Sequence, residues 1–261
     1  MGKTGLVITT YNSENWFDQL YQTIPFSTLD ECVVVNGGNT YKNIYDKHTH
    51  WIQHQTNSGA CKSRIDGIKY LRSKNVEHIF IIEDDMLIKH QDVFDIYVNA
   101  SVQSGIKYFC FCSDAPGTGV PGKRTPKITI EFPDANSKVC FYGEMNNEFT
   151  YHRSDVFDKI GYYDCSYKHL WDVEYVYRLL TSNEVGTGFR YFPDIQGSDQ
   201  YIMNLPESIN NSRTNADNQR DKELAQYLQK FEQQHGYHIA RVPILDNNSF
   251  KINLKAIYNK R

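Results

Sequence analysis

Three acidic residues stand directly after a short apolar run near the middle of the first half of the chain. Residues 79–82 read Ile-Phe-Ile-Ile, and Glu83, Asp84 and Asp85 follow without a break. A run of this length, rich in β-branched side chains, predicts a strand buried on both faces of a mostly parallel sheet. Because open α/β sheets bind ligands at the carboxyl ends of their strands, these acids are expected at a ligand-binding edge.

Adjacent carboxylates repel one another, so gathering them at a sheet edge is costly without a positive charge nearby. A divalent cation is the usual partner, and oxygen ligands suit Mg²⁺ or Mn²⁺. The alternative interpretation of residues 83–85 is a solvated acidic turn after a core strand. The three acids alone do not decide between a metal site and a solvated turn. The motifs that surround them in the chain provide the further evidence.

Strand and helix patterns alternate before the acids. Strand-like runs cover residues 5–10, 31–35 and 50–53, and helical patterns follow the first and the third of these runs. The clearest helix opens at residues 57–59, and its apolar residues are spaced by three and four: Cys61, Ile65, Ile68 and Leu71. This alternation predicts a Rossmann-like α/β fold over residues 1–105, with a mostly parallel central sheet flanked by helices.

The rhythm changes after residue 105. Local patterns predict further elements: helices over 93–100, 154–159, 171–180 and 217–234, a strand over 107–112, and antiparallel strands over 128–132 and 138–142. Residues 187–215 have little periodicity, which predicts a mobile lid or an acceptor-side loop. Residues 117–122 match the dinucleotide-binding glycine pattern, but Pro121 and Pro126 disfavour the helix that this motif requires.

Composition excludes some classes of protein. The net charge is −3, and the Lys and Arg residues form no basic stripe interleaved with aromatics, so a nucleic-acid partner is not expected. No apolar stretch approaches the ~20 residues of a membrane-spanning helix, so an integral membrane protein is not expected either. The six cysteines are scattered without a framework, which predicts reduced core thiols in a cytoplasmic protein.

The order of these motifs resembles the GT-A-fold glycosyltransferases, most closely the inverting family 2. The similarity runs from about residue 5 to 180 and rests on five segments: Thr9-Thr10-Tyr11-Asn12, Asn36-Gly37-Gly38, Asn57-Ser58-Gly59 with Ser63-Arg64, Glu83-Asp84-Asp85 at the place of the Asp-x-Asp metal motif, and Gly161-Tyr162-Tyr163-Asp164 with Trp171-Asp172. The resemblance implies a GT-A domain over residues 1–215, with a nucleotide-binding half (1–105) and an acceptor-side half (106–215). Residues 216–261 would be a helical extension packed on it.

The resemblance also implies a donor site for a nucleotide-diphosphate sugar, with UDP favoured. Asp85, with Glu83, would bind Mn²⁺ or Mg²⁺ between the phosphates, and Glu83 or Asp84 would contact the ribose or a metal-bound water. Arg64 would contact the diphosphate, and Tyr11 would stack on the base. Further donor contacts are expected from the matching motifs: Thr9, Asn12, Asn36 and Asn57.

An inverting transfer needs one base on the acceptor side, where the resemblance implies a hydroxyl of a glycan or polysaccharide. We predict Asp172 as this base, because the start of a helix favours an ionised carboxylate. The alternative interpretation of Asp172 is an N-cap aspartate of the same helix. Glu174, two residues further on, is the second candidate for the base.

Two other classes of protein remain open. A nucleotidyltransferase would share the sheet and the acidic site, but it usually carries a glycine-rich basic loop after the first strand, which residues 9–13 lack. A catalytically silent nucleotide- or sugar-binding module of the same fold is the second, because Trp171-Asp172 stands where the family has Glu-Asp. Nucleotide binding without turnover would distinguish that module from an enzyme.

Overall fold

The structure is a computed structural model of the chain. It describes residues 2–42, 45, 47–112, 124–131, 138–143, 145, 147–168, 170–182, 191–205 and 217–236, and in the last range the side chains from residue 224 onward. The segment 113–123, which contains the glycine pattern of residues 117–122, therefore lies outside the described residues, and so does the end of the chain after residue 236.

The predicted helices and strands occur in the predicted order, and the structure adds four strands that the sequence patterns did not predict, namely β5, β9, β10 and β11. The strands are β1 (Thr4–Thr10), β2 (Glu31–Asn36), β3 (His50–Gln53), β4 (His78–Glu83), β5 (Met86–Ile88), β6 (Tyr108–Cys110), β7 (Ile128–Glu131), β8 (Lys138–Tyr142), β9 (Phe149–Arg153), β10 (Phe192–Ile195) and β11 (Ile202–Asn204). The helices are α1 (Glu14–Thr23), α2 (Gly59–Ser73), α3 (Val93–Ser104), α4 (Val156–Ile160), α5 (Trp171–Thr181) and α7 (Asp217–His235), with short 3-10 turns η1 (Phe26–Thr28) and η2 (Ser198–Gln200).

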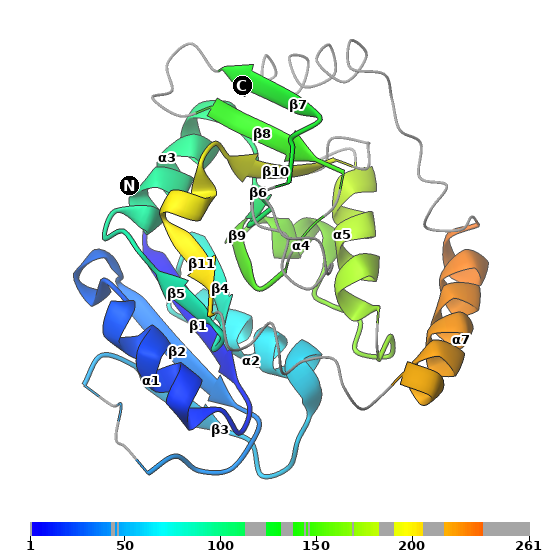
Figure 1. The fold of residues 1–261 in the computed structure, drawn as a ribbon, viewed down its shortest axis with the longest axis horizontal. Coiled ribbons are helices and arrows are strands. Elements are labelled where there is room, and N and C mark those ends of the chain that lie inside the picture. Colours follow the sequence, from blue (N-terminus) through cyan, green and yellow to red (C-terminus); the bar gives the residue numbers. More distant parts are fainter. Residues whose placement is uncertain are drawn as a thin grey trace.

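The central sheet has the strand order β3-β2-β1-β4-β9-β6 (Figure 1). β1, β2, β3 and β4 run parallel, and β9 is antiparallel to both of its neighbours. The expected mixed, mostly parallel sheet is confirmed. Because β1 lies between β2 and β4, the carboxyl ends of these three strands meet at one edge, directly before Asp84.

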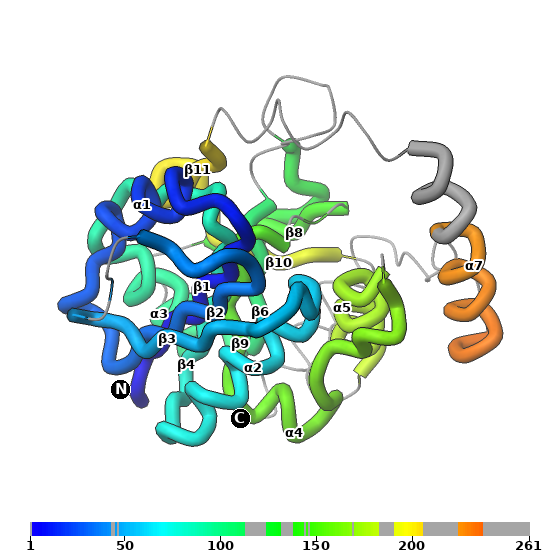
Figure 2. Tube along the Cα trace, turned by 90° about the horizontal axis from the view of Figure 1, so that it is seen from below, coloured from blue at the N-terminus to red at the C-terminus, as the bar shows by residue number. Residues whose placement is uncertain are grey.

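The sheet has a hydrophobic core on each face. Alternate residues of β1 divide between the two: Leu6 and Ile8 join the core under α1 and α3, whereas Val7 joins the core under α2 and α5. All β1 residues are buried, as expected for a strand covered on both faces. Figure 2 shows α1 on one side of the strands and α2 with α4 on the other.

Helix α2 packs very closely on β1. A Cβ atom on Gly67 would lie 2.3 Å from Cγ1 of Val7, so a larger residue at position 67 would push the helix away from the sheet. The fully buried Ile68 and Leu71 lie on the same helix and complete the contact. The start of α2 is thereby held beside the carboxyl ends of the strands.

Residues 106–215 contain more regular structure than the sequence predicts. β8 pairs with β7 and β10 in a separate antiparallel sheet, and β5 pairs with β11. β10, η2 and β11 fall within residues 187–215, so the expectation of a lid or loop is wrong for residues 192–204. The period-2 pattern was missed because these strands are short, and β10 is buried throughout.

The amphipathic helix expected near the end of the chain is confirmed as α7. Phe231 is fully buried and packs edge-on against Tyr177 of α5, with ring centroids 4.8 Å apart. Gln234 accepts a hydrogen bond from the Tyr167 hydroxyl at 2.7 Å. The helix therefore packs against residues 167 and 177 of the second half of the chain. The division of the chain at residue 215 stays a prediction, because residues 206–216 lie outside the described part.

Candidate active site

A cavity lies where β1, β2 and β4 end and α2 begins. Its volume is about 270 Å³, and the lining is contributed by these ends: Thr9, Thr10, Tyr11, Gly37, Asn57, Gly59, Ala60, Ser63, Glu83 and Asp84. Residues that the sequence predicts for donor binding come together here, namely Thr9, Tyr11, Asn57, Glu83 and Asp84. This is the strand edge at which open α/β sheets bind their ligands.

The carboxylate of Asp84 is held by the end of β1. Thr10 donates a hydrogen bond from Oγ1 to Oδ2 of Asp84, and the backbone N–H of Tyr11 donates to the same oxygen at 3.3 Å. Burial, with a contribution from the charges of Asp85 and Glu83, raises the pKa of Asp84 to about 7. The raised pKa therefore reflects chiefly the loss of hydration of the carboxylate, and the neighbouring acids add to it.

Two asparagines fix the turn after β2. Asn36 is fully buried; its Oδ1 accepts from the backbone N–H of Gly38, and its Nδ2 donates to the carbonyl of Asn39, both at 2.8 Å. Asn12, with a φ of 54°, accepts from the N–H of Asn39 at 2.7 Å. A Cβ on Gly38 would lie 2.3 Å from Oδ1 of Asn12, so glycine is required there. Asn12 and Asn36 shape the turn beside the cavity, and their direct contact with a donor stays a prediction.

Arg64 is fully buried on α2. Its Nη2 donates to Oε1 of Glu83 and, at 2.6 Å, to the backbone carbonyl of Asn147. The guanidinium also lies 5.0 Å from the ring centroid of Trp171. Burial disfavours the cation, but Glu83 and Tyr163 together outweigh this effect, so the pKa of Arg64 lies above its ordinary value. Arg64 thus pairs with a cavity-lining acid, and its predicted contact with a diphosphate is untested.

Asp172, the predicted base, lies in the first turn of α5. Its Oδ1 accepts from the backbone N–H of Val173 at 2.8 Å, and its Oδ2 accepts from Nδ2 of Asn147 at 3.1 Å. Burial raises the pKa of Asp172, whereas these hydrogen bonds and the charge of Arg64 oppose the rise. The N-cap position belongs to Leu170, so the alternative interpretation of Asp172 as the N-cap residue is wrong.

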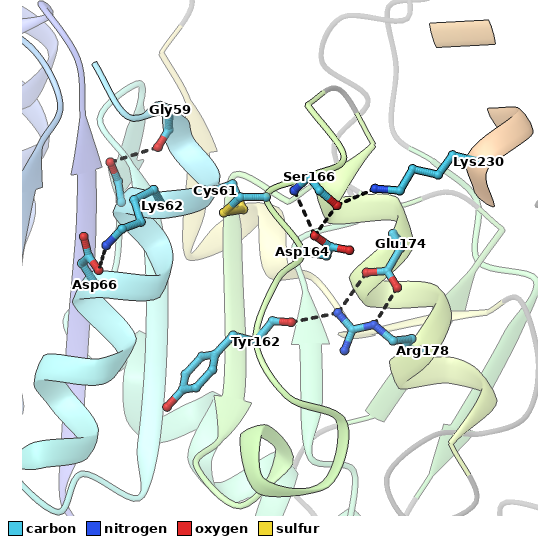
Figure 3. Close-up of a disulfide and its surroundings, with 12 residues drawn as sticks. Gly59, Cys61, Lys62, Asp66, Tyr162, Asp164, Ser166, Glu174, Arg178 and Lys230 are labelled. Carbon is cyan, nitrogen blue, oxygen red and sulfur yellow. Dashed lines mark hydrogen bonds and ion pairs between the residues drawn. A yellow bond between two sulfur atoms is a disulfide. The ribbon is translucent and has the colours of Figure 1, made fainter. Parts of the chain in front are cut away.

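Glu174, the second candidate for the base, is fully buried and bound on both oxygens. Arg178 donates from Nε to Oε1 at 2.7 Å and from Nη2 to Oε2 at 2.9 Å (Figure 3). His235 of α7 brings its Nε2 within 3.4 Å of Oε1. The carboxylate thus joins α5 to α7. A catalytic role for Glu174 would require these contacts to break, and it stays a prediction.

A disulfide joins the two halves of the chain beside the site. Cys61 of α2 and Cys165, which lies before α5, are bonded across a sequence separation of 104 (Figure 3). The expectation that all six cysteines are reduced is therefore wrong for this pair, whose distant positions follow no recognisable framework. The remaining cysteines are buried free thiols, as predicted: Cys32, Cys110, Cys112 and Cys140.

The acids at the cavity fit a metal ion only together with a substrate. In the part of the chain that the structure describes, no three His, Cys, Asp or Glu side chains converge on a common point. Glu83 is paired with Arg64, and the backbone carbonyl of Asp85 accepts from the N–H of Leu205 at 2.7 Å. Mg²⁺ is commonly held by one or two carboxylates and completed by substrate phosphates, and Glu83 and Asp84 at the cavity fit that mode of binding. Asp85 is not among the residues that line the cavity, and its role as a metal ligand stays a prediction.

Sequence reasoning did not single out several residues of the site. Thr10, Gly37, Ala60 and Ser63 line the cavity, and each is next to a residue that was predicted or lies in the same motif. These four residues could have been predicted from the sequence by including the immediate neighbours of the residues in each motif. Asn147 carries no such indication, because it belongs to none of the matching segments and meets Asp172 only in the folded chain.

An α/β sheet with a cavity at the carboxyl ends of its parallel strands and acids at that edge is the arrangement expected of the GT-A fold. No family model and no curated protein matches the sequence. Solved structures match it in fold. TarS 1–349 of S. aureus is 15% identical with a TM-score of 0.59, and the match covers 99% of this chain and 71% of that one.

Two further structures extend the comparison. The same part of TarS in complex with UDP-GlcNAc gives a TM-score of 0.60 at 15% identity, over 99% of this chain and 72% of that one. The mannosyltransferase PcManGT from Pyrobaculum calidifontis, in complex with GDP-Man and Mn²⁺, gives 0.55 at 13% identity, over 98% and 68%. The predicted GT-A glycosyltransferase fold is confirmed, and at this identity the likeness extends to the fold alone. None of the described helices is long and apolar enough to cross a membrane.

Proposed function

We propose that the protein is a glycosyltransferase that moves a sugar from a nucleotide-diphosphate sugar to a hydroxyl group of a glycan or polysaccharide acceptor. The observation that carries the proposal is the cavity at the ends of β1, β2 and β4, with Glu83 and Asp84 in its lining. Neighbours of the same fold were solved with UDP, UDP-GlcNAc and GDP-Man, which supports a donor of this chemical class.

UDP is the favoured nucleotide of the donor. TarS was solved with UDP and UDP-GlcNAc, while PcManGT was solved with GDP-Man, so both bases are compatible with the fold. Tyr11 lines the cavity and is 50% exposed, which leaves its ring available to stack on a base. The nucleotide panel described below discriminates between these donors.

A Mg²⁺ or Mn²⁺ ion is expected to accompany the donor, held by Asp85 and Glu83 together with the donor phosphates. When bound, such an ion offsets the negative charge that develops on the departing diphosphate. The chain's own contribution is to keep acids gathered at the cavity: Thr10 and Tyr11 hold Asp84, and Arg64 holds Glu83.

Asp172 is the base in this proposal, and the reaction is a direct displacement with inversion. The acceptor hydroxyl becomes acidic as it attacks the sugar, and a carboxylate close by takes its proton. Hydrogen bonds from Val173 and Asn147 hold both oxygens of Asp172, and the start of α5 favours the ionised form. The cytoplasmic location remains a prediction.

The first test measures the melting temperature of the protein with UDP, GDP, CDP, dTDP and CMP, each with and without Mn²⁺. A ligand that binds only the folded state adds ~2.7 kcal/mol at a hundredfold excess over its dissociation constant, which raises the melting temperature. We expect a metal-dependent rise with one nucleotide, and UDP is favoured. Asp158→Asn, which alters an exposed acid paired with Arg72, is the matched control and should respond like the wild type.

Transfer is then measured with the sugar nucleotide of the base that binds, and the anomeric configuration of the product reports inversion or retention. Binding without any transfer would favour the silent nucleotide-binding module. The absence of a shift with every nucleotide would contradict a sugar-nucleotide enzyme, and the acids would then be a solvated turn.

A further inference from the structure

We infer that Asn147 is a positioning residue that holds the carboxylate of Asp172 at a fixed position relative to the donor cavity. The inference rests on the proposed function, because Asp172 is the base only if the protein transfers a sugar. Asn147 lies between β8 and β9, outside every motif that the sequence offers. In this inference Asn147 does not bind the donor. It affects the reaction through its hydrogen bond to Asp172.

The backbone at Asn147 is anchored to the acidic edge of the cavity at two adjacent positions. The carbonyl of Asn147 accepts from Nη2 of Arg64 at 2.6 Å, and the same nitrogen donates to Glu83. The next carbonyl, that of Glu148, accepts from the backbone N–H of Glu83 at 2.9 Å. The position of Asn147 is therefore set by Glu83, which is both the last residue of β4 and part of the cavity lining.

The side chain of Asn147 is oriented from the opposite side. The hydroxyl of Tyr108, a fully buried residue of β6, donates to Oδ1 of Asn147 at 3.3 Å. On its other side the amide faces α5, where Nδ2 donates to Oδ2 of Asp172 at 3.1 Å. Because an ionised carboxylate only accepts, it requires the amide nitrogen on its side, and the Tyr108 hydroxyl supplies the donor that the amide oxygen then needs.

These contacts form one continuous path from the donor cavity to the base. It runs from Glu83 through Arg64 to the backbone of Asn147, and through the side chain of Asn147 to Asp172. Each contact involves a buried or partly buried group, where hydrogen bonds to charged partners are strong. Sub-ångström placement of a catalytic group matters for rate, and a misplacement of 1 Å can cost about 100-fold.

Asn147 also affects the protonation of Asp172. Burial raises the pKa of Asp172, and the hydrogen bond from Asn147 opposes that rise. The charged and titratable groups that act on Asp172 from neighbouring elements are Arg64 on α2 and Tyr163 before α5. Removing the amide donor should therefore move the pKa of Asp172 upward while Arg64 and Tyr163 stay in place.

The test compares wild type with Asn147→Leu, which has a similar shape without the amide, and with Tyr108→Phe, which removes only the orienting hydroxyl. Asn99→Leu on the exposed face of α3 is the matched control. We expect Asn147→Leu to lower kcat by about 10- to 100-fold, with KM for the donor and the nucleotide-induced rise in melting temperature within twofold of wild type. Tyr108→Phe should lower kcat less, and it serves if the leucine variant fails to fold.

A second readout does not depend on turnover. The carboxyl carbon resonance of Asp172, assigned by its loss in Asp172→Asn, reports the pKa directly. We expect this pKa to rise in Asn147→Leu, and the acidic limb of the pH–rate profile to move to higher pH with it, because only the ionised base accepts a proton.

Unchanged kcat and unchanged Asp172 pKa in both variants would overturn the inference. A loss of donor binding in Asn147→Leu would also overturn it, because Asn147 would then support the donor cavity rather than the base. If the wild type transfers no sugar, the proposed function fails on its own, and the carboxyl pKa still decides whether Asn147 holds Asp172.

Discussion

Arg64 and Glu83 form an ion pair that joins helix α2 to the end of strand β4. The Arg64 side chain is fully buried, whereas 32% of the Glu83 side chain is exposed. The pair is therefore asymmetric: Glu83 can be hydrated from the cavity, but Arg64 depends on Glu83 for its counter-charge. The Glu83 carboxylate at the edge of the cavity thus stabilises the fold, in addition to any contact with a substrate.

Replacing Glu83 should destabilise the fold, and the loss should depend on whether the new side chain still offers Arg64 a hydrogen-bond acceptor. Glu83→Leu leaves the buried cation without its carboxylate and should lower the free energy of unfolding by ~3–5 kcal/mol. Glu83→Gln keeps an acceptor oxygen and should cost only ~1–3 kcal/mol. Urea unfolding measures both, and Glu131→Gln, in an exposed pair with Lys138, should change little. Equal losses in the two Glu83 variants would refute the ion-pair account.

Asp85→Asn should remove the effect of Mn²⁺ on nucleotide binding. The amide carries no charge and is a poorer ligand for a hard divalent cation than a carboxylate. We expect the Mn²⁺-dependent rise in melting temperature with UDP to disappear, while the protein without ligand melts close to wild type. Asp95→Asn on α3 should retain the full rise. A variant at position 85 that still responds to low Mn²⁺ would place the metal ligand elsewhere.

Asp172→Asn should abolish turnover without affecting the donor. The amide keeps the shape of the side chain but cannot take a proton from the acceptor, so kcat should fall by ~10²–10⁴. Donor affinity, measured by calorimetry, should stay within about twofold. Near-normal turnover in this variant would show that the base is another residue, and Glu174→Gln would then be the next variant to assay.

Opening the disulfide should destabilise the protein. The Cys61–Cys165 bond closes a loop with a sequence separation of 104, so reduction or the Cys61→Ala/Cys165→Ala double variant should lower the free energy of unfolding by ~2–4 kcal/mol. Urea unfolding with and without reductant measures this. The double variant should be indifferent to reductant, and a wild type that is equally indifferent would argue against the bond.

Asp194 should make stability depend on pH. It is fully buried in β10, and burial raises its pKa from 3.8 to about 7. Because the folded state holds this proton more tightly than the unfolded chain, the associated stability is complete below about pH 4 and is lost as the pH rises to about 7. The free energy of unfolding should fall by up to ~1.4 kcal/mol per pH unit over this range, relative to Asp194→Asn. Parallel pH curves for the two proteins would contradict the buried titration.

Strong local patterns explain why much of the fold was predictable. The run before Glu83 is apolar on every residue and short, which leaves a two-sided strand as the economical interpretation, and β4 is that strand. The helix from Gly59 was predictable because its apolar residues recur with helical spacing, and Ile68 and Leu71 face the sheet. Once the strands are parallel, the acids and the turn residues must share an edge.

Two kinds of feature were not predictable from the sequence: strands of only three or four residues, and contacts between residues far apart in the chain. β10 and β11 are too short for a reliable period, and η2 lies between them. The bond between Cys61 and Cys165 depends on where two loops meet in space, and cysteine spacing gives no pairing in a chain of this length.

The sequence by itself determined the order of the predicted elements and the edge of the sheet at which the acids lie. These follow from periodicity and from the geometry of parallel strands, both of which are local or repeat along the chain. Only the tertiary structure decided which partner each charged side chain has: Arg64 pairs with Glu83, Glu174 with Arg178, and Asp172 with Asn147. Partner choice depends on which side chains are buried together, and burial is a property of the packed chain.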